Sequence, residues 1–300
     1  METTTETAEP QTQDAPPAKE PSALDERIER IKTKMWVPYP EANEVFKIMR
    51  RLQDAPNENR PENLAVIGDP SFGKSYLLKR YVLRNQSSYD PAQRDPTIDI
   101  VHIDMPETPE PGAMLREILQ KIGAGRTIRE SIDEMRRRIC VLAEAMKVRL
   151  FIIDEFHNAF RTGTNRQHHL LLNIVRTLTT LTNRPLVVAG TEEVDHFLEF
   201  DQQLDERFIR RRLKKWDDTA TAQRLLKGFE QEIQLQNSAD LASPEMTTHV
   251  INLTNGKMGR IARLLILAAE DAIRKGTETI DKDLLSVMAT QLSGRSSEMD

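Results

Sequence analysis

The feature that most constrains the fold of this 300-residue chain is the stretch from Gly68 to Ser75, which joins a short apolar run to a segment with helical spacing of apolar residues. Gly68, Gly73, Lys74 and Ser75 fit the pattern G-x-x-x-x-G-K-[ST] of a phosphate-binding P-loop. The two glycines allow backbone conformations that a Cβ would resist, so successive N–H groups can surround a polyphosphate. The helix that follows directs the positive end of its dipole at the same anion. The stretch therefore predicts a strand, a loop and a helix built around a bound nucleotide.

The residues of this loop have distinct expected roles. Lys74 is expected to reach the β and γ phosphates, and the Ser75 hydroxyl is expected to hold Mg2+. Tyr39, which precedes the loop together with Pro40, either packs against the bound base or forms a turn that packs on the core. The predicted nucleotide-binding residues are Tyr39, Gly68, Asp69, Pro70, Ser71, Phe72, Gly73, Lys74, Ser75 and Tyr76.

The composition is typical of a soluble globular protein, with 38% hydrophobic and 30% charged residues. No apolar run approaches the roughly 18 residues of a membrane span, and the amino terminus has no basic-then-apolar signal peptide. The single cysteine, Cys140, cannot form an internal disulfide and lies in an apolar-periodic segment, so we expect it to be a core residue and not a nucleophile. These features predict a cytoplasmic protein with no membrane partner.

The net charge of −5 does not exclude nucleic acid as a partner, because the negative charge is concentrated at one end of the chain. Residues 1–26 contain seven acidic residues against one lysine, which gives −6 and leaves +1 for the remaining chain. A nearly neutral body with clustered arginines can still bind DNA.

The pattern along the chain predicts four regions. Residues 1–23, rich in Thr, Glu, Pro and Ala, predict a disordered acidic tail. Residues 24–216 predict an α/β nucleotide-binding domain, with two N-terminal helices split by the prolines of residues 36–40 and then strands alternating with helices, as in a parallel sheet flanked by helices. Residues 217–292 have only helical periodicity and predict a small all-helical lid of about four helices. Residues 293–300 predict a polar tail.

Two acidic residues end the buried strand that follows the P-loop by about 80 residues. Asp154 is expected to hold the Mg2+ shell through water, and Glu155 to accept a proton from the attacking water. A polar loop is then predicted over residues 161–167 and a helix over residues 169–181. Thr191, at the end of the next apolar strand, either hydrogen-bonds the γ-phosphate or the water, or only occupies a turn.

Arginines in two further places are candidates for contact with the γ-phosphate. The stretch from 204 to 216 contains six cations, of which Arg207 is the candidate for a finger presented to a neighbouring subunit. The cations from Arg210 to Lys215 either function with it or only guard an edge strand. Arg260, in the first turn of a lid helix, is expected to couple nucleotide state to the lid, with Arg263 as the reserve candidate one turn later.

In this order, the P-loop, Asp154-Glu155, Thr191, Arg207 and Arg260 resemble the Walker A, Walker B, sensor 1, arginine finger and sensor 2 residues of an AAA+ ATPase. Within that superfamily the chain resembles the TniB transposition ATPases, relatives of TnsC and MuB. The similarity extends from about residue 25 to residue 290. The matching stretches are Tyr39-Pro40, Asp154-Glu-Phe-His-Asn158, Val188-Ala-Gly-Thr191, Gln203-Leu-Asp-Glu-Arg-Phe208 and Gly259-Arg-Ile-Ala-Arg-Leu-Leu265.

The resemblance implies an AAA+ P-loop NTPase fold that uses ATP and Mg2+ at subunit interfaces. It implies a homo-oligomer, a ring or a helical filament, that assembles on double-stranded DNA with little sequence preference. The family selects a target site and recruits or activates a partner transposase, which performs the strand transfer. Two alternatives remain: a helicase-loader or clamp-loader-like remodeller, and a non-enzymatic nucleotide switch, against which Glu155 argues.

Candidate DNA contacts are basic residues outside these motifs. Lys79 and Arg80 lie in the helix after the P-loop, and Arg161, Arg166 and His168 follow the Walker B strand. Each of these residues is alternatively a solvated surface residue.

Overall fold

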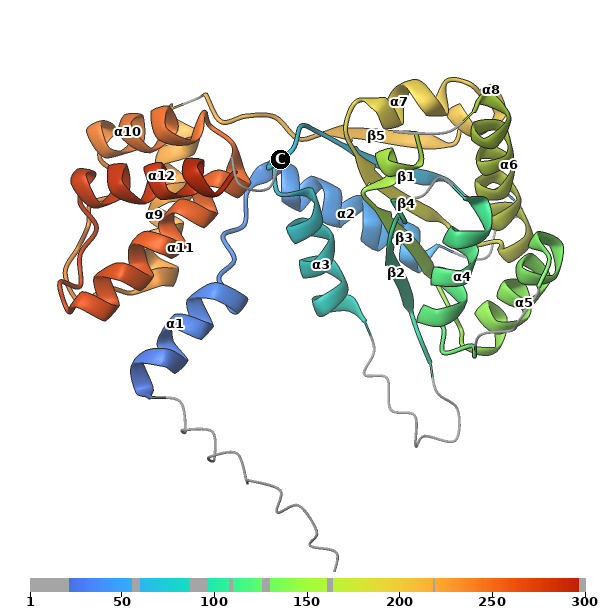
Figure 1. Ribbon diagram of the computed structural model, residues 1–300, viewed down its shortest axis with the longest axis horizontal. Coiled ribbons are helices and arrows are strands. Elements are labelled where there is room, and N and C mark those ends of the chain that lie inside the picture. Colours follow the sequence, from blue (N-terminus) through green and yellow to red (C-terminus); the bar gives the residue numbers. More distant parts are fainter. Residues whose placement is uncertain are drawn as a thin grey trace, which may run out of the picture.

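The computed structural model describes residues 22–55, 60–86, 97–107, 110–125, 130–160, 164–217 and 219–296. These residues form an α/β part built on one sheet and a group of helices that we call the lid (Figure 1). The acidic tail predicted over residues 1–23 lies outside the described residues except for Ser22 and Ala23, and Arg161 lies outside them as well. None of the described helices is long and apolar enough to cross a membrane.

Two helices precede the P-loop, as predicted. Helix α1 (Ala23–Lys34) begins at a capping box, in which the Ser22 side chain accepts the N–H of Asp25 and the Asp25 carboxylate accepts the N–H of Ser22. Helix α2 (Pro40–Asp54) has Pro40 in its first turn, where a missing N–H costs no intrahelical hydrogen bond.

The sheet is parallel throughout its five described strands, which confirms the predicted α/β class. The strands are β1 (Asn63–Ile67), β2 (Ile100–Asp104), β3 (Leu150–Asp154), β4 (Leu186–Gly190) and β5 (Phe208–Arg212). Their order is β2-β3-β4-β1-β5, so β5 is an edge strand. Ile67 pairs with Gly190 and Asp104 pairs with Asp154, so the carboxyl ends of these strands meet at one edge. Ligands of open parallel sheets bind at that edge.

Helices cover both faces of the sheet, so its central strands are buried and almost wholly apolar. Val66 and Ile152 pack toward α2 and α3, whereas Ile67 and Ile153 pack toward α4, α5 and α6 on the opposite face. The remaining elements of this part are α3 (Lys74–Asn85), α4 (Pro111–Lys121), α5 (Ile132–Ala145), the 3-10 helix η1 (Phe156–Ala159), α6 (Asn165–Thr182), α7 (Glu193–Leu198) and α8 (Gln202–Asp205).

Helix α6 begins earlier than the sequence predicted. The predicted polar loop extended to residue 167, but α6 starts at Asn165. Thr164 is its N-cap, because the Thr164 side chain accepts the N–H of Gln167 while the Gln167 side chain accepts the N–H of Thr164.

The lid contains four described helices, in agreement with the prediction. They are α9 (Thr219–Ile233), α10 (Pro244–Thr254), α11 (Met258–Lys275) and α12 (Lys282–Ser296). Helix α12 continues to Ser296, past residue 292, where the sequence predicted the start of a polar tail.

Helix α1 lies against the lid, although it precedes the α/β part in the chain (Figure 1). The Arg27 guanidinium donates to the Glu278 carboxylate at 2.7 Å and to the main-chain oxygen of Gln234 at 2.6 Å. Lys32 forms a second ion pair with Glu270 at 2.7 Å. The sequence placed both N-terminal helices in the α/β domain of residues 24–216. In the structure α2 packs with the sheet, whereas α1 packs with the lid, and the domain boundary at residue 216 stays a proposal.

Candidate functional site

The P-loop connects β1 to α3 at the carboxyl edge of the sheet. Gly73, the N-cap of α3, has a φ of +87°, a left-handed conformation that favours glycine. At Gly68, an added Cβ would lie 3.1 Å from Phe72 Cδ2 and 3.2 Å from the main-chain oxygen of Leu213. Both glycines of the motif are therefore required by the local geometry, one by its backbone angle and the other by close packing.

Lys74 is folded over the loop and is only 6% exposed. Its Nζ donates to the main-chain oxygens of Gly68 at 2.6 Å and Asp69 at 3.1 Å. Burial lowers the pKa of this amine, while the nearby carboxylates of Glu155 and Asp154 oppose the shift. The carbonyl oxygens of the loop therefore accept hydrogen bonds from the amine that the sequence predicted would donate to phosphate oxygens.

Asp154 and Glu155 extend from the end of β3 toward this lysine. Asp154 is 1% exposed, and its Oδ1 accepts the main-chain N–H of Glu155 at 2.8 Å. Its Oδ2 has no hydrogen-bond partner. Glu155 has a φ of +51°, which is costly for a residue with a side chain and is found where a site holds a group in a fixed place.

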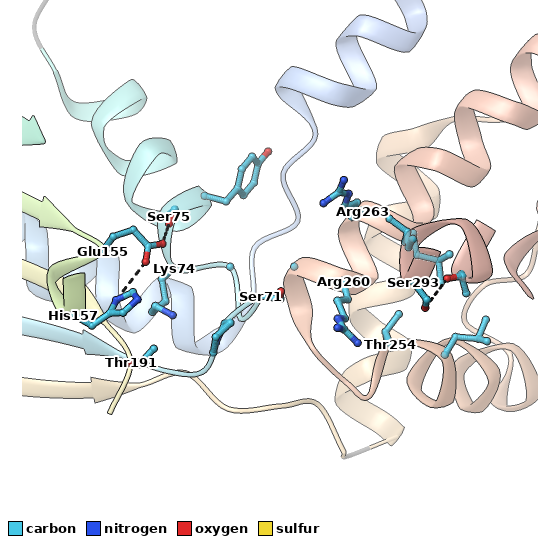
Figure 2. A pocket seen from close by; sticks show the side chains of 18 residues that line it. Ser71, Lys74, Ser75, Glu155, His157, Thr191, Thr254, Arg260, Arg263 and Ser293 are labelled. Carbon is cyan, nitrogen blue, oxygen red and sulfur yellow. Dashed lines mark hydrogen bonds and ion pairs between the residues drawn. The ribbon is translucent and has the colours of Figure 1, made fainter. Parts of the chain in front are cut away.

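The Glu155 carboxylate lies between a hydroxyl and an imidazole (Figure 2). Ser75 Oγ donates to Glu155 Oε1 at 3.3 Å, and His157 Nδ1 lies 3.4 Å from Glu155 Oε2. His157, which the sequence suggested only as an orienting neighbour or a strand cap, is thus in contact with the predicted base. The predicted Mg2+ ligand Ser75 and the predicted base Glu155 are adjacent.

Thr191 lies directly after β4 at the same edge, and its hydroxyl donates to Glu193 Oε2 at 3.4 Å. Preceding it, Gly190 allows a close approach, since an added Cβ would lie 3.2 Å from the main-chain nitrogen of His157 and 2.5 Å from Val194 Cγ2. The 3-10 helix η1 therefore sits tightly against β4, which brings His157 and Thr191 to the same cleft.

The cleft has a volume of about 430 Å3 and lies between the P-loop and the lid. Arg260 and Arg263 of α11 face Lys74 and Glu155 across it (Figure 2). Both arginines are exposed, and no hydrogen bond or ion pair joins either of them to another residue that the structure describes. Of the predicted loop residues, Gly68, Asp69 and Phe72 do not line the cleft. Those that line it are Pro70, Ser71, Gly73, Lys74, Ser75 and Tyr76.

The lid touches the P-loop directly at the start of α11. The main-chain N–H of Gly259 donates to the main-chain oxygen of Ser71 at 2.8 Å. An added Cβ on Gly259 would lie 2.6 Å from that oxygen, so only glycine fits. Lys257 Nζ lies 5.7 Å from the centroid of the Phe72 ring. Sequence reasoning noted Gly259 only as the start of a helix and missed this contact.

A second, mostly apolar cavity of about 250 Å3 adjoins the cleft. The two cavities share Gly73, Tyr76, Gly259 and Arg263. The remaining lining residues come from α1, the α1–α2 connection and the lid: Lys32, Met35, Trp36, Val37, Tyr39, Phe229, Met258, Ala262 and Ile266.

The sequence left two alternatives for Tyr39, a contact with the bound base or a turn that packs on the core, and its position is compatible with both. It is buried and packs edge-on against Trp216, with 5.6 Å between ring centroids, and it also lines the apolar cavity. Burial raises the pKa of its hydroxyl, so it stays protonated. Tyr76 lines both cavities, and its hydroxyl donates to the main-chain oxygen of Met35.

Arg207 lies far from this cleft. It directly precedes β5, and its main-chain oxygen accepts the N–H of Asn63 at 2.7 Å, at the amino edge of the sheet. A five-residue strand rises about 3.3 Å per residue, so about 17 Å of β5 separates Arg207 from the carboxyl edge. Arg207 cannot act on a nucleotide held by its own P-loop.

The basic run after Arg207 is largely engaged in ion pairs, which favours the edge-strand interpretation. Arg210 Nε donates to Asp195 Oδ1 at 2.6 Å, and Arg210 also pairs with Asp205. Arg212 pairs with Asp195 and with Glu192, at 3.3 Å from the latter. Asp195 is buried on α7, so these arginines tie the edge strand β5 to that helix.

The candidate DNA contacts do not form one surface. Lys79 and Arg80 lie on α3, and the Arg80 guanidinium lies 5.8 Å from the centroid of the Trp36 ring. Arg166 and His168 lie on α6, which covers the opposite face of the sheet. Arg166 is exposed, whereas the His168 ring packs edge-on against Phe160.

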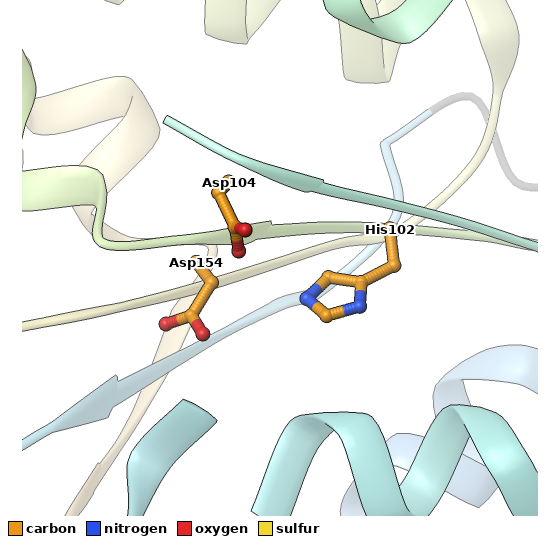
Figure 3. Close-up of side chains that lie close together, drawn as sticks. All are labelled: His102, Asp104 and Asp154. Atoms are coloured by element: carbon orange, nitrogen blue, oxygen red, sulfur yellow. The ribbon is translucent and has the colours of Figure 1, made fainter. Parts of the chain in front are cut away.

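Two residues of β2 lie beside Asp154, and the sequence gave no role to either. His102 and Asp104 offer ligand atoms that lie within 4.8 Å of one another and of an Asp154 oxygen (Figure 3). Burial lowers the pKa of the His102 imidazole. The carboxylates of Asp154 and Asp104 oppose this shift, whereas the charges of Lys121 and Lys79 add to it. The alternation His102-Ile-Asp104 at a strand end was the available signal, but its proximity to Asp154 depends on strand order.

Comparison with known protein families identifies the family of the chain. The sequence model described as bacterial TniB protein matches residues 27–218, which includes the P-loop, Asp154-Glu155, Thr191 and Arg207. No curated protein sequence matches the chain.

Solved structures show the fold. The ORC2 protein of Aeropyrum pernix, in ADPNP–ADP complexes, has a TM-score of 0.61 at 15% identity over 87% of this chain and 71% of that chain. The A. pernix ORC1 protein in complex with DNA has a TM-score of 0.61 at 13% identity, over 88% and 69%. Cdc6p from Pyrobaculum aerophilum has a TM-score of 0.56 at 14% identity, over 84% and 68%. At such identities the likeness shows the fold alone, which is that of an AAA+ P-loop NTPase.

Proposed function

Because this chain belongs to the bacterial TniB protein family, we propose that it is an ATP-dependent, DNA-binding regulator of transposition. It assembles on target DNA, selects the target site, and recruits or activates a partner transposase, which performs the strand transfer. The observation that supports this proposal most directly is the cleft in which the P-loop lysine, the buried acid pair and the lid arginines face one another.

Lys74 and Ser75 prepare the site for a triphosphate. Lys74 exchanges its two main-chain acceptors, on Gly68 and Asp69, for the β and γ phosphates of ATP. The Ser75 hydroxyl and the unpartnered Oδ2 of Asp154 suit an oxygen-ligated Mg2+, the first directly and the second through water. When bound, this ion neutralises charge on the β and γ phosphates.

Glu155 is the proposed general base. Its carboxylate is held between Ser75 and His157, beside the P-loop, and it accepts a proton from the water that attacks the γ-phosphate. Thr191, at the next strand end, positions that water or the γ-phosphate through its hydroxyl. Arg260 contacts the γ-phosphate from the lid, with Arg263 one turn away on the same cleft wall.

The apolar cavity beside the cleft is the proposed base site. Its walls are mostly aromatic and aliphatic, and it shares Gly73 and Gly259 with the cleft, so a nucleotide can place its base there and its phosphates on the loop. Trp36 and Tyr39 supply ring surfaces on one wall and Met258 lies on the lid wall.

Arg207 is the proposed finger, and its position makes the active site a property of two subunits. Because it lies at the amino edge of the sheet, it can complete only the site of a neighbouring subunit. ATP at such an interface would stabilise a homo-oligomer, a ring or a helical filament, which then binds duplex DNA mainly through phosphates.

Electron microscopy of the full chain with ATP, Mg2+ and duplex DNA of arbitrary sequence tests the assembly. We expect regular oligomers on DNA that are absent without ATP and absent for Lys74→Ala. If the chain stays monomeric and does not bind DNA at saturating ATP, the proposal is wrong and only nucleotide binding remains. A transposase gene beside this one, whose product shows increased strand transfer when this chain is added, would favour the proposed role. Loading of a helicase ring would instead favour the helicase-loader alternative.

A further inference from the structure

His102 and Asp104, which have no proposed role in ATP hydrolysis, converge with Asp154 on the α3 side of the sheet. His102 and Asp104 lie on β2, and Asp154 lies directly opposite Asp104 on β3. His102 and Asp104 are two residues apart on one strand, so their side chains leave the same face. Figure 3 shows the imidazole and the two carboxylates directed into one space, and their ligand atoms all lie within 4.8 Å of one another.

Two buried polar atoms of this cluster lack partners. Asp154 is only 1% exposed. Its Oδ1 accepts the Glu155 N–H, and its Oδ2 accepts no hydrogen bond. His102 Nε2 is also buried without a partner. Among the described residues, no lysine or arginine lies within ion-pair distance of Asp104 or Asp154. Like charges directly opposite on neighbouring strands repel, and buried polar atoms without partners are rare in folded proteins.

We propose that His102, Asp104 and Asp154 form a binding site for a divalent transition-metal cation of the Mn2+ or Zn2+ class. One imidazole nitrogen with two carboxylate oxygens is a donor set for such ions, and it differs from the all-oxygen set that Mg2+ prefers. Ligand atoms around one ion at about 2.0–2.2 Å lie at most about 4.4 Å apart, so a small rotation of the side chains closes the cluster. Bound there, the cation supplies the missing partner of each buried atom and offsets the repulsion between the two carboxylates.

This site is distinct from the proposed Mg2+ site of the nucleotide. That site requires Ser75, whose hydroxyl faces Glu155, and it includes neither His102 nor Asp104. Asp154 is common to both sites: its Oδ1 already accepts the Glu155 N–H, so Oδ2 serves whichever cation is bound. Occupation by a transition metal would therefore fix Asp154 to β2 and couple the metal to the nucleotide site. The inference does not rest on the proposed function, because metal binding can be measured without nucleotide or DNA.

Mn2+ is the probe, because its free ion gives an electron paramagnetic resonance signal that disappears on binding. The full chain, freed of metal and nucleotide, is titrated with Mn2+, and we expect one tight site per chain. His102→Gln and Asp104→Asn should each weaken binding by about tenfold or more, since each removes one of three protein ligands. Asp104 is exposed, so its variant tests the site with little risk to folding.

Two further variants separate the site from its surroundings. Ser75→Ala removes a proposed Mg2+ ligand of the nucleotide site but no ligand of the new site, so Mn2+ affinity should not change. Lys79→Ala should not weaken Mn2+ binding, because Lys79 is exposed and supplies no ligand of the new site. The thermal unfolding midpoint of each nucleotide-free variant, without metal, controls for folding.

The outcomes decide the proposal in either direction. A Mn2+-dependent rise in the unfolding midpoint of the nucleotide-free chain that is lost in Asp104→Asn supports it. Wild-type protein that binds no Mn2+, or binds it equally after His102→Gln, overturns it and leaves an ordered water as the partner of these atoms. A loss of Mn2+ binding in Ser75→Ala would also overturn it, by assigning the ion to the nucleotide site.

Discussion

The two sides of the nucleotide cleft differ in how far their polar groups already have partners. On the sheet side, Lys74 donates to two loop carbonyls, and Ser75 donates to Glu155. On the lid side, Arg260 and Arg263 are exposed and have no hydrogen bond or ion pair to another described residue. The sheet side is therefore organised by the fold itself, whereas the lid arginines need a ligand before they are held in place.

Because of this difference, substitutions on the two sides should have different effects. A change on the sheet side alters groups that interact in the nucleotide-free protein, so it affects both the protein and its complex. A change of a lid arginine removes nothing that the described structure uses without a ligand, so it should affect the complex alone. A third region, the amino edge of the sheet with Arg207, belongs to neither side.

The largest effect is expected at Arg207, which lies outside the cleft of its own chain. We expect Arg207→Ala to lower the ATPase rate by about 10³-fold or more, because a finger neutralises transition-state charge. Mixing Arg207→Ala with Lys74→Ala should restore part of the steady-state rate, since each variant supplies the group that the other lacks. Absence of any rescue across mixing ratios would count against action on a neighbouring subunit.

The sheet side should show the next largest effect. Glu155→Gln is expected to lower the ATP turnover number by about 10²- to 10⁴-fold, because the amide cannot accept the proton of the attacking water. ATP affinity should stay near that of the wild type, and protein should accumulate on DNA. Glu199→Gln, which changes an exposed acid after α7, is the matched control. Hydrolysis at the wild-type rate by Glu155→Gln would show that the base is another residue.

The contact between the two sides can be tested at one atom. Gly259→Ala places a Cβ 2.6 Å from the Ser71 main-chain oxygen, so either α11 or the P-loop must move. A forced shift that costs about 1–3 kcal/mol predicts a loss of ATP affinity of about 5- to 150-fold, measured by calorimetry. Gly125→Ala is the control, because a Cβ at Gly125 would meet nothing within 4 Å. Equal affinities for the two variants would mean that this contact is irrelevant to nucleotide binding.

The parts of the site formed by consecutive residues could be predicted from the sequence. The P-loop pattern located Gly73 and Lys74, and the apolar run before two acids located Asp154 and Glu155 at the end of a buried strand. The parallel sheet flanked by helices is likewise confirmed, because periodicity and turn residues are local signals. For Arg210 to Lys215 the sequence left two interpretations open, and the ion pairs favour the edge strand. The roles of these residues stay predictions until they are measured.

The parts that the sequence could not give depend on contacts between distant residues. Arg27 and Glu278, which attach α1 to the lid, are 251 positions apart, and no local pattern links them. The cluster of His102 and Asp104 with Asp154 requires β2 to pair with β3 in one register, which periodicity does not specify. The early start of α6 was missed for another reason, since the Thr164 capping box was a local signal that the prediction overlooked.

The lid side gives the smallest and most diagnostic expected effect. Arg260→Ala should change the free energy of unfolding of the nucleotide-free protein by less than about 0.5 kcal/mol, because the side chain is exposed and makes no described hydrogen bond or ion pair. Since an exposed charge pair contributes about 0.2–1 kcal/mol, ATP affinity should fall only by up to about fivefold. Denaturant unfolding with and without ATP measures both quantities in one series, with Arg263→Ala beside it. If Arg260→Ala destabilised the nucleotide-free chain as much as the complex, the lid arginine would have a structural role, and the contrast between the two sides of the cleft would not hold.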